Sequence, residues 1–334
     1  MKKNHHADDP TAWERLLGML HVERSTINYI FLHAMLIGLI GLTLPLGTTA
    51  VFNFLSNGAL YSSTYILIGI VLLGIVVGGL LLIGQLTLVE VLEQRIFAKA
   101  TLEFAYRFPR IKRDELTGEY PPELVNRFFD VLTIQKGIAK LLVDVVAAAV
   151  QIFFAAILLS FYHPVFMTFG IITVLVIVLM LTTFFRRGLQ TSIEESAYKY
   201  EVVAYLEQVA GDLDSYRNRP DKMEMVIAET DRITANYLKS RNAHFRVLKK
   251  FFFSSVALRT ILMGGLLLLG SYYVVERQMT LGQFVAAEVI IVQIAYAIEK
   301  FMTSLDTIFD MVTGSEKLAA VTDLELEESE VNNG

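Results

Sequence analysis

Six long apolar stretches dominate this sequence and limit what it can fold into. They occupy residues 27–54, 65–89, 141–161, 165–185, 251–275 and 281–302. Each reaches or exceeds the roughly 20 residues that an α-helix needs to cross a hydrocarbon core. The first follows 26 polar or amphipathic residues without a small-residue cleavage site, so we expect a membrane span and not a signal peptide. The sequence predicts an all-α membrane protein with six transmembrane helices.

Lysine and arginine are distributed unevenly among the segments that connect these spans. Of the 29 such residues, 27 lie in the N-terminal segment, in the loops after spans two and four, or at the end of span six and beyond. The other three loops together hold only Arg277, and Arg259 lies inside span five. By the positive-inside rule, both termini and the two long loops are predicted to be cytoplasmic.

The two long loops are expected to continue the helices of the spans. Residues 65–108 contain no proline, and at 1.5 Å per residue such a helix measures about 66 Å against a hydrocarbon core of about 30 Å. Proline is also absent from residues 123–162, 165–210 and 221–280. The spans should therefore extend into the cytoplasm as two helical hairpins. We expect their tips near residues 113–122 and 211–221, where proline and glycine cluster.

This pattern divides the chain into three parts. Residues 1–26 form a cytoplasmic N-terminus, in which residues 11–21 are predicted to be an interfacial elbow helix. Residues 27–320 form the six-span domain, and Pro45 is expected to bend its first span because proline lacks a backbone donor. Residues 321–334 are acidic, lack helical periodicity, and are expected to be a linker.

Several kinds of chemistry have no residues to support them. The chain has no cysteine, and its net charge of −5 gives no basic field for nucleic acid. Neither a phosphate-binding loop nor a serine-nucleophile motif occurs, and His33, His163 and His244 are isolated in the sequence. We therefore expect no catalytic residues, no bound metal, no cofactor and no enzymatic activity on this chain.

Four short segments resemble type I ABC exporters, in the order and at the spacing of that family. PELVNRFFDV (residues 122–131) is similar to the first cytoplasmic tip, and LEQVAGDL (206–213) to the second. MTLGQFVAAE (279–288) resembles the opening of the sixth span, and EKLAAVTDL (316–324) the approach to the ATPase domain. Pro122 stands where the family usually has glycine, and Asp212 replaces an apolar residue, so contact details at the tips differ.

The resemblance implies a homodimer in which spans four and five cross to the partner subunit, in the cytoplasmic (inner) membrane of a bacterium. It implies a nucleotide-binding partner that carries ATP and Mg²⁺, either as a separate polypeptide or as a domain removed from this chain. It also allows a periplasmic adaptor protein. The implied contacts with the ATPase lie at the tips: Glu123, Asn126, Arg127, Asp130, Glu207 and Gly211.

Three polar residues inside the spans are candidates for the substrate pathway: Arg259, Glu288 and Gln293. A charge at such depth costs about 2.5–3.5 kcal/mol on insertion scales, so it indicates a cavity or an ion pair. We expect Glu288 either to pair with Arg259, within one subunit or across the dimer, or to face a polar cavity. The alternatives are that Arg259 snorkels to the interface or that span five starts later. Asp144 is expected to be interfacial.

The sequence leaves the cargo open. The first hypothesis is the membrane subunit of an ATP-driven exporter that works by alternating access, with a peptide or polypeptide as cargo. Lipid or drug export is the alternative within this class. A different class is a passive six-span channel or scaffold without a motor.

Overall fold

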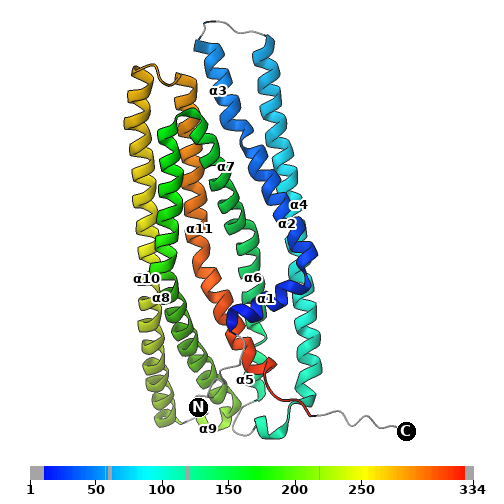
Figure 1. The fold of residues 1–334 in the computed structure, drawn as a ribbon. Coiled ribbons are helices and arrows are strands. Elements are labelled where there is room, and N and C mark those ends of the chain that lie inside the picture. The colour runs from blue at the N-terminus through cyan, green and yellow to red at the C-terminus, as the bar shows by residue number, and fades with distance from the viewer. Residues whose placement is uncertain (1–10, 57, 59–61, 117–120, 218, 328–334) are drawn as a thin grey trace, which may run out of the picture.

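The computed structural model describes residues 11–56, 58, 62–116, 121–217 and 219–327. This part of the chain is helical apart from short connections and one isolated β-bridge, and six of its helices are long and apolar enough to cross a membrane (Figure 1). The prediction of an all-α, six-span membrane protein is confirmed at this level. The connections between spans alternate between two ends of the molecule, and we call the end that carries the short helix α9 the α9 end.

The first span consists of two helices, α2 (Arg24–Gly41) and α3 (Thr43–Ser56), with a break at Leu42. Pro45 has no N–H to donate to the carbonyl of Gly41, and its ring crowds that carbonyl. The helix therefore breaks about one turn before the proline. The second span, α4 (Ser62–Arg107), is one helix of 46 residues, as its lack of proline predicted.

The segment between α4 and α7 is less regular than predicted. Two short 3₁₀ helices, η1 (Phe108–Arg110) and η2 (Arg113–Leu116), are followed by α5 (Pro121–Asn126) and α6 (Phe129–Ala139). A π-helical segment, η3 (Lys140–Val145), joins α6 to α7 (Val146–Tyr162). The prediction of one continuous helix over residues 123–162 is wrong, because turns at Arg127 and Phe128 separate α5 from α6. Part of the predicted first tip, residues 117–120, lies outside the described residues.

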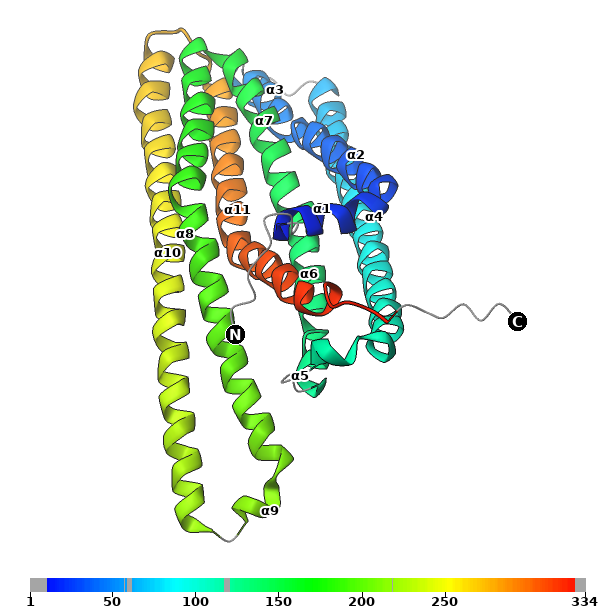
Figure 2. The same ribbon diagram turned by 60° about the horizontal axis from the view of Figure 1, so that its bottom comes forward.

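The second half of the chain is built from three long helices. Helices α8 (Pro164–Gly211) and α10 (Pro220–Val275) lie side by side, and the short helix α9 (Leu213–Tyr216) lies between their ends (Figure 2). Helix α11 (Leu281–Thr322) starts at a capping box formed by Thr280 and Gln283. It lies between the α8–α10 pair and the helices of the N-terminal half (Figure 1).

Two groups of buried side chains hold the helices together, and α11 contributes to both. The first group joins α7, α8, α10 and α11, and includes the fully buried Phe166, Phe251 and Phe309. The second joins α4, α6, the end of α11 and α1 (Ala12–Val22). At Gly188 a Cβ atom would lie 2.4 Å from the Phe309 ring, so α8 and α11 approach closely because this residue is glycine. The position of α11 thus depends on both halves of the molecule.

Both ends of the described chain are attached to α4 or to the segment that follows it. Glu23, directly after α1, forms ion pairs with Lys99 and, at 3.0 Å, with Arg95 of α4. After α11, the N–H of Glu327 donates to the carbonyl of Arg110 (2.7 Å), within an antiparallel bridge. The predicted linker, residues 321–334, is therefore helical at its start and paired with residues 110–112 further on. Its last seven residues lie outside the described part.

Candidate functional site

A polar face runs along α11 through the membrane-spanning segment. Spacings of three and four residues place its members on one side of the helix. We call the following residues the polar face: Glu288, Val292, Tyr296, Glu299 and Thr303, all of them exposed. An exposed carboxylate in hydrocarbon costs several kcal/mol, and membrane proteins direct such groups toward protein or a water-filled cavity. This side of α11 is therefore suited to water or polar cargo and unsuited to lipid.

Arg259 of α10 pairs with the polar face, but not at the position that the sequence suggested. Its Nη1 lies 3.4 Å from Oε2 of Glu299. Within this subunit Arg259 does not pair with Glu288, and Glu288 is exposed without a carboxylate–cation contact among the described residues. Gln293 is half-buried and lies about 100° around the helix from Val292. Of the three predicted pathway residues, Glu288 belongs to the polar face. Arg259 pairs with Glu299 of that face, and Gln293 lies outside it.

A second charged cluster lies where the π-helix meets α11. Asp144 is 9% exposed and pairs with Lys140 and with Lys300 of α11, each at 3.0 Å. The hydroxyl of Ser304 donates to the same carboxylate at 3.3 Å. The expectation of an interfacial Asp144 did not anticipate this burial. Two lysines compensate the buried carboxylate, as a buried charge requires, and the cluster fixes α11 against the third span.

Residues predicted at the two separate tips come together beside α8. The side-chain amide of Asn126 donates to Oε1 of Glu207, and the Tyr200 hydroxyl donates to Oδ2 of Asp130 at 2.5 Å. The guanidinium of Arg127 lies 4.0 Å from the centroid of the Tyr200 ring, as a cation–π contact. We call this group the tip junction. The other two predicted coupling residues are not part of it, because Gly211 ends α8 and the side chain of Glu123 lies outside the described residues.

Charge in the tip junction is concentrated around Tyr200. Lys317 of α11 lies 5.7 Å from the ring centroid and Lys199 lies 5.8 Å away. Burial raises the pKa of Asp130, although the hydrogen bond from Tyr200 and the nearby cations oppose this rise. Burial, with the Arg127 charge second, lowers the pKa of Lys317. The junction thus joins α5, α6, α8 and α11 through partly desolvated charges, and Tyr200 lies in no motif that marks it in the sequence.

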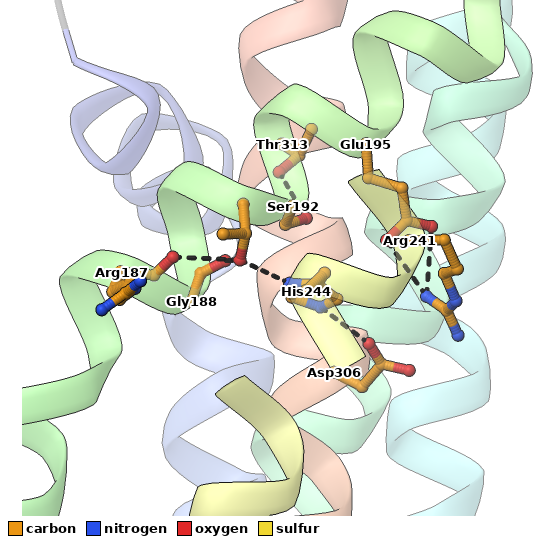
Figure 3. A network of polar contacts seen from close by, with 9 residues as sticks. Arg187, Gly188, Ser192, Glu195, Arg241, His244, Asp306 and Thr313 are labelled. Carbon is orange, nitrogen blue, oxygen red and sulfur yellow. Dashed lines mark hydrogen bonds and ion pairs between the residues drawn. The ribbon is translucent and has the colours of Figure 1, made fainter. Parts of the chain in front are cut away.

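A third polar network joins α8, α10 and α11 between the tip junction and the membrane (Figure 3). His244 of α10 is 1% exposed, and its ring lies between Thr191 Oγ1, 2.9 Å from Nδ1, and Asp306 Oδ1, 3.1 Å from Nε2. The hydrogen bond with His244, followed by the charge of Arg241, lowers the pKa of Asp306 against the effect of burial. Because this carboxylate accepts, Nε2 of His244 carries a proton. His244 had appeared isolated, since its partners lie 53 and 62 residues away in the sequence.

Two more contacts support this network at the same level. Arg241 of α10 donates to Glu195 of α8 at 3.1 Å, and the hydroxyls of Ser192 and Thr313 lie 3.0 Å apart (Figure 3). The three long helices are thus linked by specific polar contacts below the membrane. Within the described residues, no group of three or more His, Asp and Glu side chains has the arrangement of a metal site.

Comparison with protein-family models and with curated proteins finds no match for this chain. Three places in the structure carry polar groups suited to function. These are the polar face inside the membrane, the His244 network below it, and the tip junction. Helix α11 contributes residues to all three places, so a displacement of α11 at one of them also affects the other two.

Proposed function

We propose that this protein is the membrane subunit of an ATP-driven exporter that works by alternating access, with a peptide or polypeptide as cargo. The observation that carries the proposal is the polar face of α11. Its carboxylates lie within a membrane-spanning segment and are exposed, which is unfavourable against lipid and favourable beside a water-filled pathway. Tyr296, with an exposed ring and a phenolic hydroxyl, adds a group that accepts both apolar and polar parts of a peptide.

The proposed partner is a nucleotide-binding ATPase, either a separate chain or a domain beyond this one, which binds ATP and Mg²⁺. It engages the end of the molecule that holds Asn126, Arg127, Asp130 and Glu207, together with Glu123 and Gly211. The tip junction supports this role because it gathers polar groups from α5, α6, α8 and α11. A force on the tips then reaches α11 through Lys317 and, one level higher, through Asp306.

The proposed assembly is a homodimer in a bacterial inner membrane, with both termini and the α9 end in the cytoplasm. The distribution of lysine and arginine supports this orientation, since only Arg277 lies in the loops at the opposite end. In the proposed dimer, spans four and five (α8 and α10) exchange between subunits, and the polar faces of two α11 helices face a common cavity. A periplasmic adaptor is compatible with the short loops on that side.

The test is purification of the tagged chain in mild detergent from the cells that naturally produce it. We expect a polypeptide with a phosphate-binding loop to copurify, and the eluate to hydrolyse ATP with sensitivity to vanadate. In proteoliposomes, the double variant Asn126→Ala/Glu207→Ala should lose most ATP-driven transport. The matched exposed variant Glu224→Ala on α10 should retain it.

The contradicting result is equally concrete. If no nucleotide-binding partner copurifies and the purified chain alone gives passive peptide or ion flux in liposomes, the exporter proposal fails. That outcome favours the passive channel, which uses the same polar face without a motor.

A further inference from the structure

Helices α8 and α10 each change abruptly from aromatic to basic side chains at one end of their membrane-spanning segments. In α8, two phenylalanines are followed directly by two arginines, at residues 184–187. In α10, two lysines are followed directly by three phenylalanines, at residues 249–253. Such a change is typical of the boundary between hydrocarbon and lipid headgroups.

The two boundaries lie beside each other in the structure. The rings of Phe184 and Phe251 meet edge to face, with centroids 5.6 Å apart. The ammonium group of Lys250 lies 5.8 Å from the centroid of the Phe184 ring. The basic ends of both helices therefore stand at the same height, although the helices run in opposite directions.

Trp13 supports the assignment of this height to the membrane interface. It is the only tryptophan in the chain, it is 36% exposed, and its ring stacks on Phe185 with centroids 6.2 Å apart. Tryptophan is enriched at the level of the headgroups, where an apolar ring with one polar N–H is favoured. The elbow helix α1 and the basic ends of α8 and α10 thus mark one level.

The cations at this level have no carboxylate partners within the described residues. All five are exposed: Arg186, Arg187, Arg246, Lys249 and Lys250. Helix α8 has no acidic residue between 164 and 193, and α10 has none between 232 and 275. On the opposite side of the molecule, by contrast, Glu23 forms ion pairs with both Arg95 and Lys99 of α4.

We propose that these five cations, which we call the basic belt, form a binding surface for anionic phospholipids. A lipid phosphate supplies the negative charge that the belt lacks. Its acyl chains cover exposed apolar side chains that begin at the belt, among them Leu179 of α8 and Phe253 and Val256 of α10. A soluble anion satisfies only the charges, whereas a phospholipid satisfies both features, so the surface is assigned to lipid. The assignment does not depend on the proposed transport function.

Trp13 provides a local reporter for the test. The full chain is reconstituted with phosphatidylcholine, and quenching of Trp13 by brominated phosphatidylglycerol is compared with quenching by brominated phosphatidylcholine. We expect the native protein to prefer the anionic lipid by at least about fivefold, which is the effect of a single cation near the headgroups. Native mass spectrometry provides a second measurement, which counts the phosphatidylglycerol molecules that remain bound in detergent.

The decisive variant replaces all five belt cations by glutamine. The ratio of its quenching by phosphatidylglycerol to that by phosphatidylcholine should fall to near one. In phosphatidylcholine the variant should keep the helical content and melting temperature of the native protein. The control variant removes five cations nearer the α9 end, and it should keep the native preference: Arg217→Gln, Arg219→Gln, Lys222→Gln, Arg232→Gln and Lys239→Gln.

The proposal is overturned if the native protein shows no preference by either measurement. It is also overturned if the belt variant keeps the native preference, or if the control variant loses it equally. If inorganic phosphate or soluble glycerophosphoglycerol abolishes the preference at the same concentration as the lipid, the surface binds soluble anions and the assignment to lipid is wrong.

Discussion

Helices α4 and α11 both cross the membrane, yet they present opposite kinds of surface to their surroundings. In the most apolar stretch of α4 no residue is buried, whereas half of the corresponding stretch of α11 is buried. The exposed side chains of α4 in this region are aliphatic, such as Val76 and Leu80. The exposed side of α11 instead carries Glu288 and Glu299.

The two helices differ in whether their polar side chains are buried or exposed. The span of α4 contains one amide side chain, Gln85, which is fully buried and directs its nitrogen toward the carbonyl of Leu142 at 3.5 Å. Helix α11 buries apolar residues and exposes carboxylates. Lipid tolerates an exposed leucine and excludes an exposed charge. The comparison therefore indicates that α4 faces lipid and that α11 faces water or protein on its polar side.

The buried side of α11 should give the largest effect. Phe309 is fully buried against Phe185, with ring centroids 5.1 Å apart, and against Phe251. We expect Phe309→Ala to lower the free energy of unfolding by about 3–5 kcal/mol, because it leaves a cavity among three helices. The control Thr303→Ala on the polar face should change it by less than about 0.5 kcal/mol. Denaturation in detergent measures both, and equal losses would contradict the assignment of the two sides.

A matched pair of valines compares the two helices directly. Val76 of α4 and Val292 of α11 are 58% and 46% exposed, and both lie near the middle of their spans. Val76→Lys should cost about 2.5–3.5 kcal/mol on an insertion scale, because its ammonium group meets hydrocarbon. Val292→Lys should cost clearly less, since it joins a face that already carries charge. Membrane-inserted yield and melting temperature measure the difference, and the opposite ranking would refute the comparison.

Beyond the membrane segment, the polar side of α11 should make the stability of the protein depend on pH. Asp310 continues this side of α11. Partial loss of surrounding water, followed by the charge of Asp306, raises the pKa of Asp310 from 3.8 to about 6, although the residue keeps contact with solvent. The folded protein then keeps a proton that the unfolded chain loses, so stability falls as pH rises from about 4 to 6. Asp310→Asn should remove this loss and raise stability above pH 6, by less than about 1 kcal/mol because the side chain is accessible.

Melting curves of Asp310→Asn and native protein at pH 4 and pH 8 check this prediction. The two proteins should melt alike at pH 4. A stabilisation that is the same at both values would show that the variant acts through contacts and not through the carboxyl proton.

The smallest effect concerns the ion pair of Arg259 and Glu299. Both side chains are more than half exposed, at 56% and 59%. A double-mutant cycle with Arg259→Leu and Glu299→Leu should give a coupling of at most about 1 kcal/mol. The same cycle with Glu288→Leu should give none within error. Coupling of Arg259 to Glu288 alone would restore the pairing that the sequence suggested.

The helices could be predicted because their boundaries are set by local residues. Proline or glycine marks both ends of α8, the start of α10 and the end of α4, and the long proline-free runs have no other stable form in a membrane. The π-helix around Asp144 and the turns at Arg127 and Phe128 have no such marker. They arise from tertiary packing, so the sequence predicted a continuous helix there.

The site was predictable to a smaller extent for a geometric reason. Glu288 and Glu299 are three helical turns apart on the same side of α11, so their phase does not select a partner for Arg259. The packing of α11 against α10 places Glu299 within 3.4 Å of Arg259, and no local stretch of sequence encodes this packing. The same holds for His244, whose neighbours come from two other helices. The tip residues could be proposed because they form short motifs that resemble a known family, whereas the contacts of Arg127 and Asp130 with Tyr200 required the structure.

The claim that α11 borders an aqueous pathway is tested most directly by single cysteines in this cysteine-free chain. Val292→Cys, Tyr296→Cys and Glu299→Cys on α11 are compared with Val76→Cys and Leu80→Cys on α4, in native membranes. A charged, membrane-impermeant thiol reagent reacts with the thiolate, which forms only where water has access. We predict rapid modification of all three α11 positions and very slow modification of both α4 positions. Equal rates at the two helices, or faster modification of α4, would contradict the account.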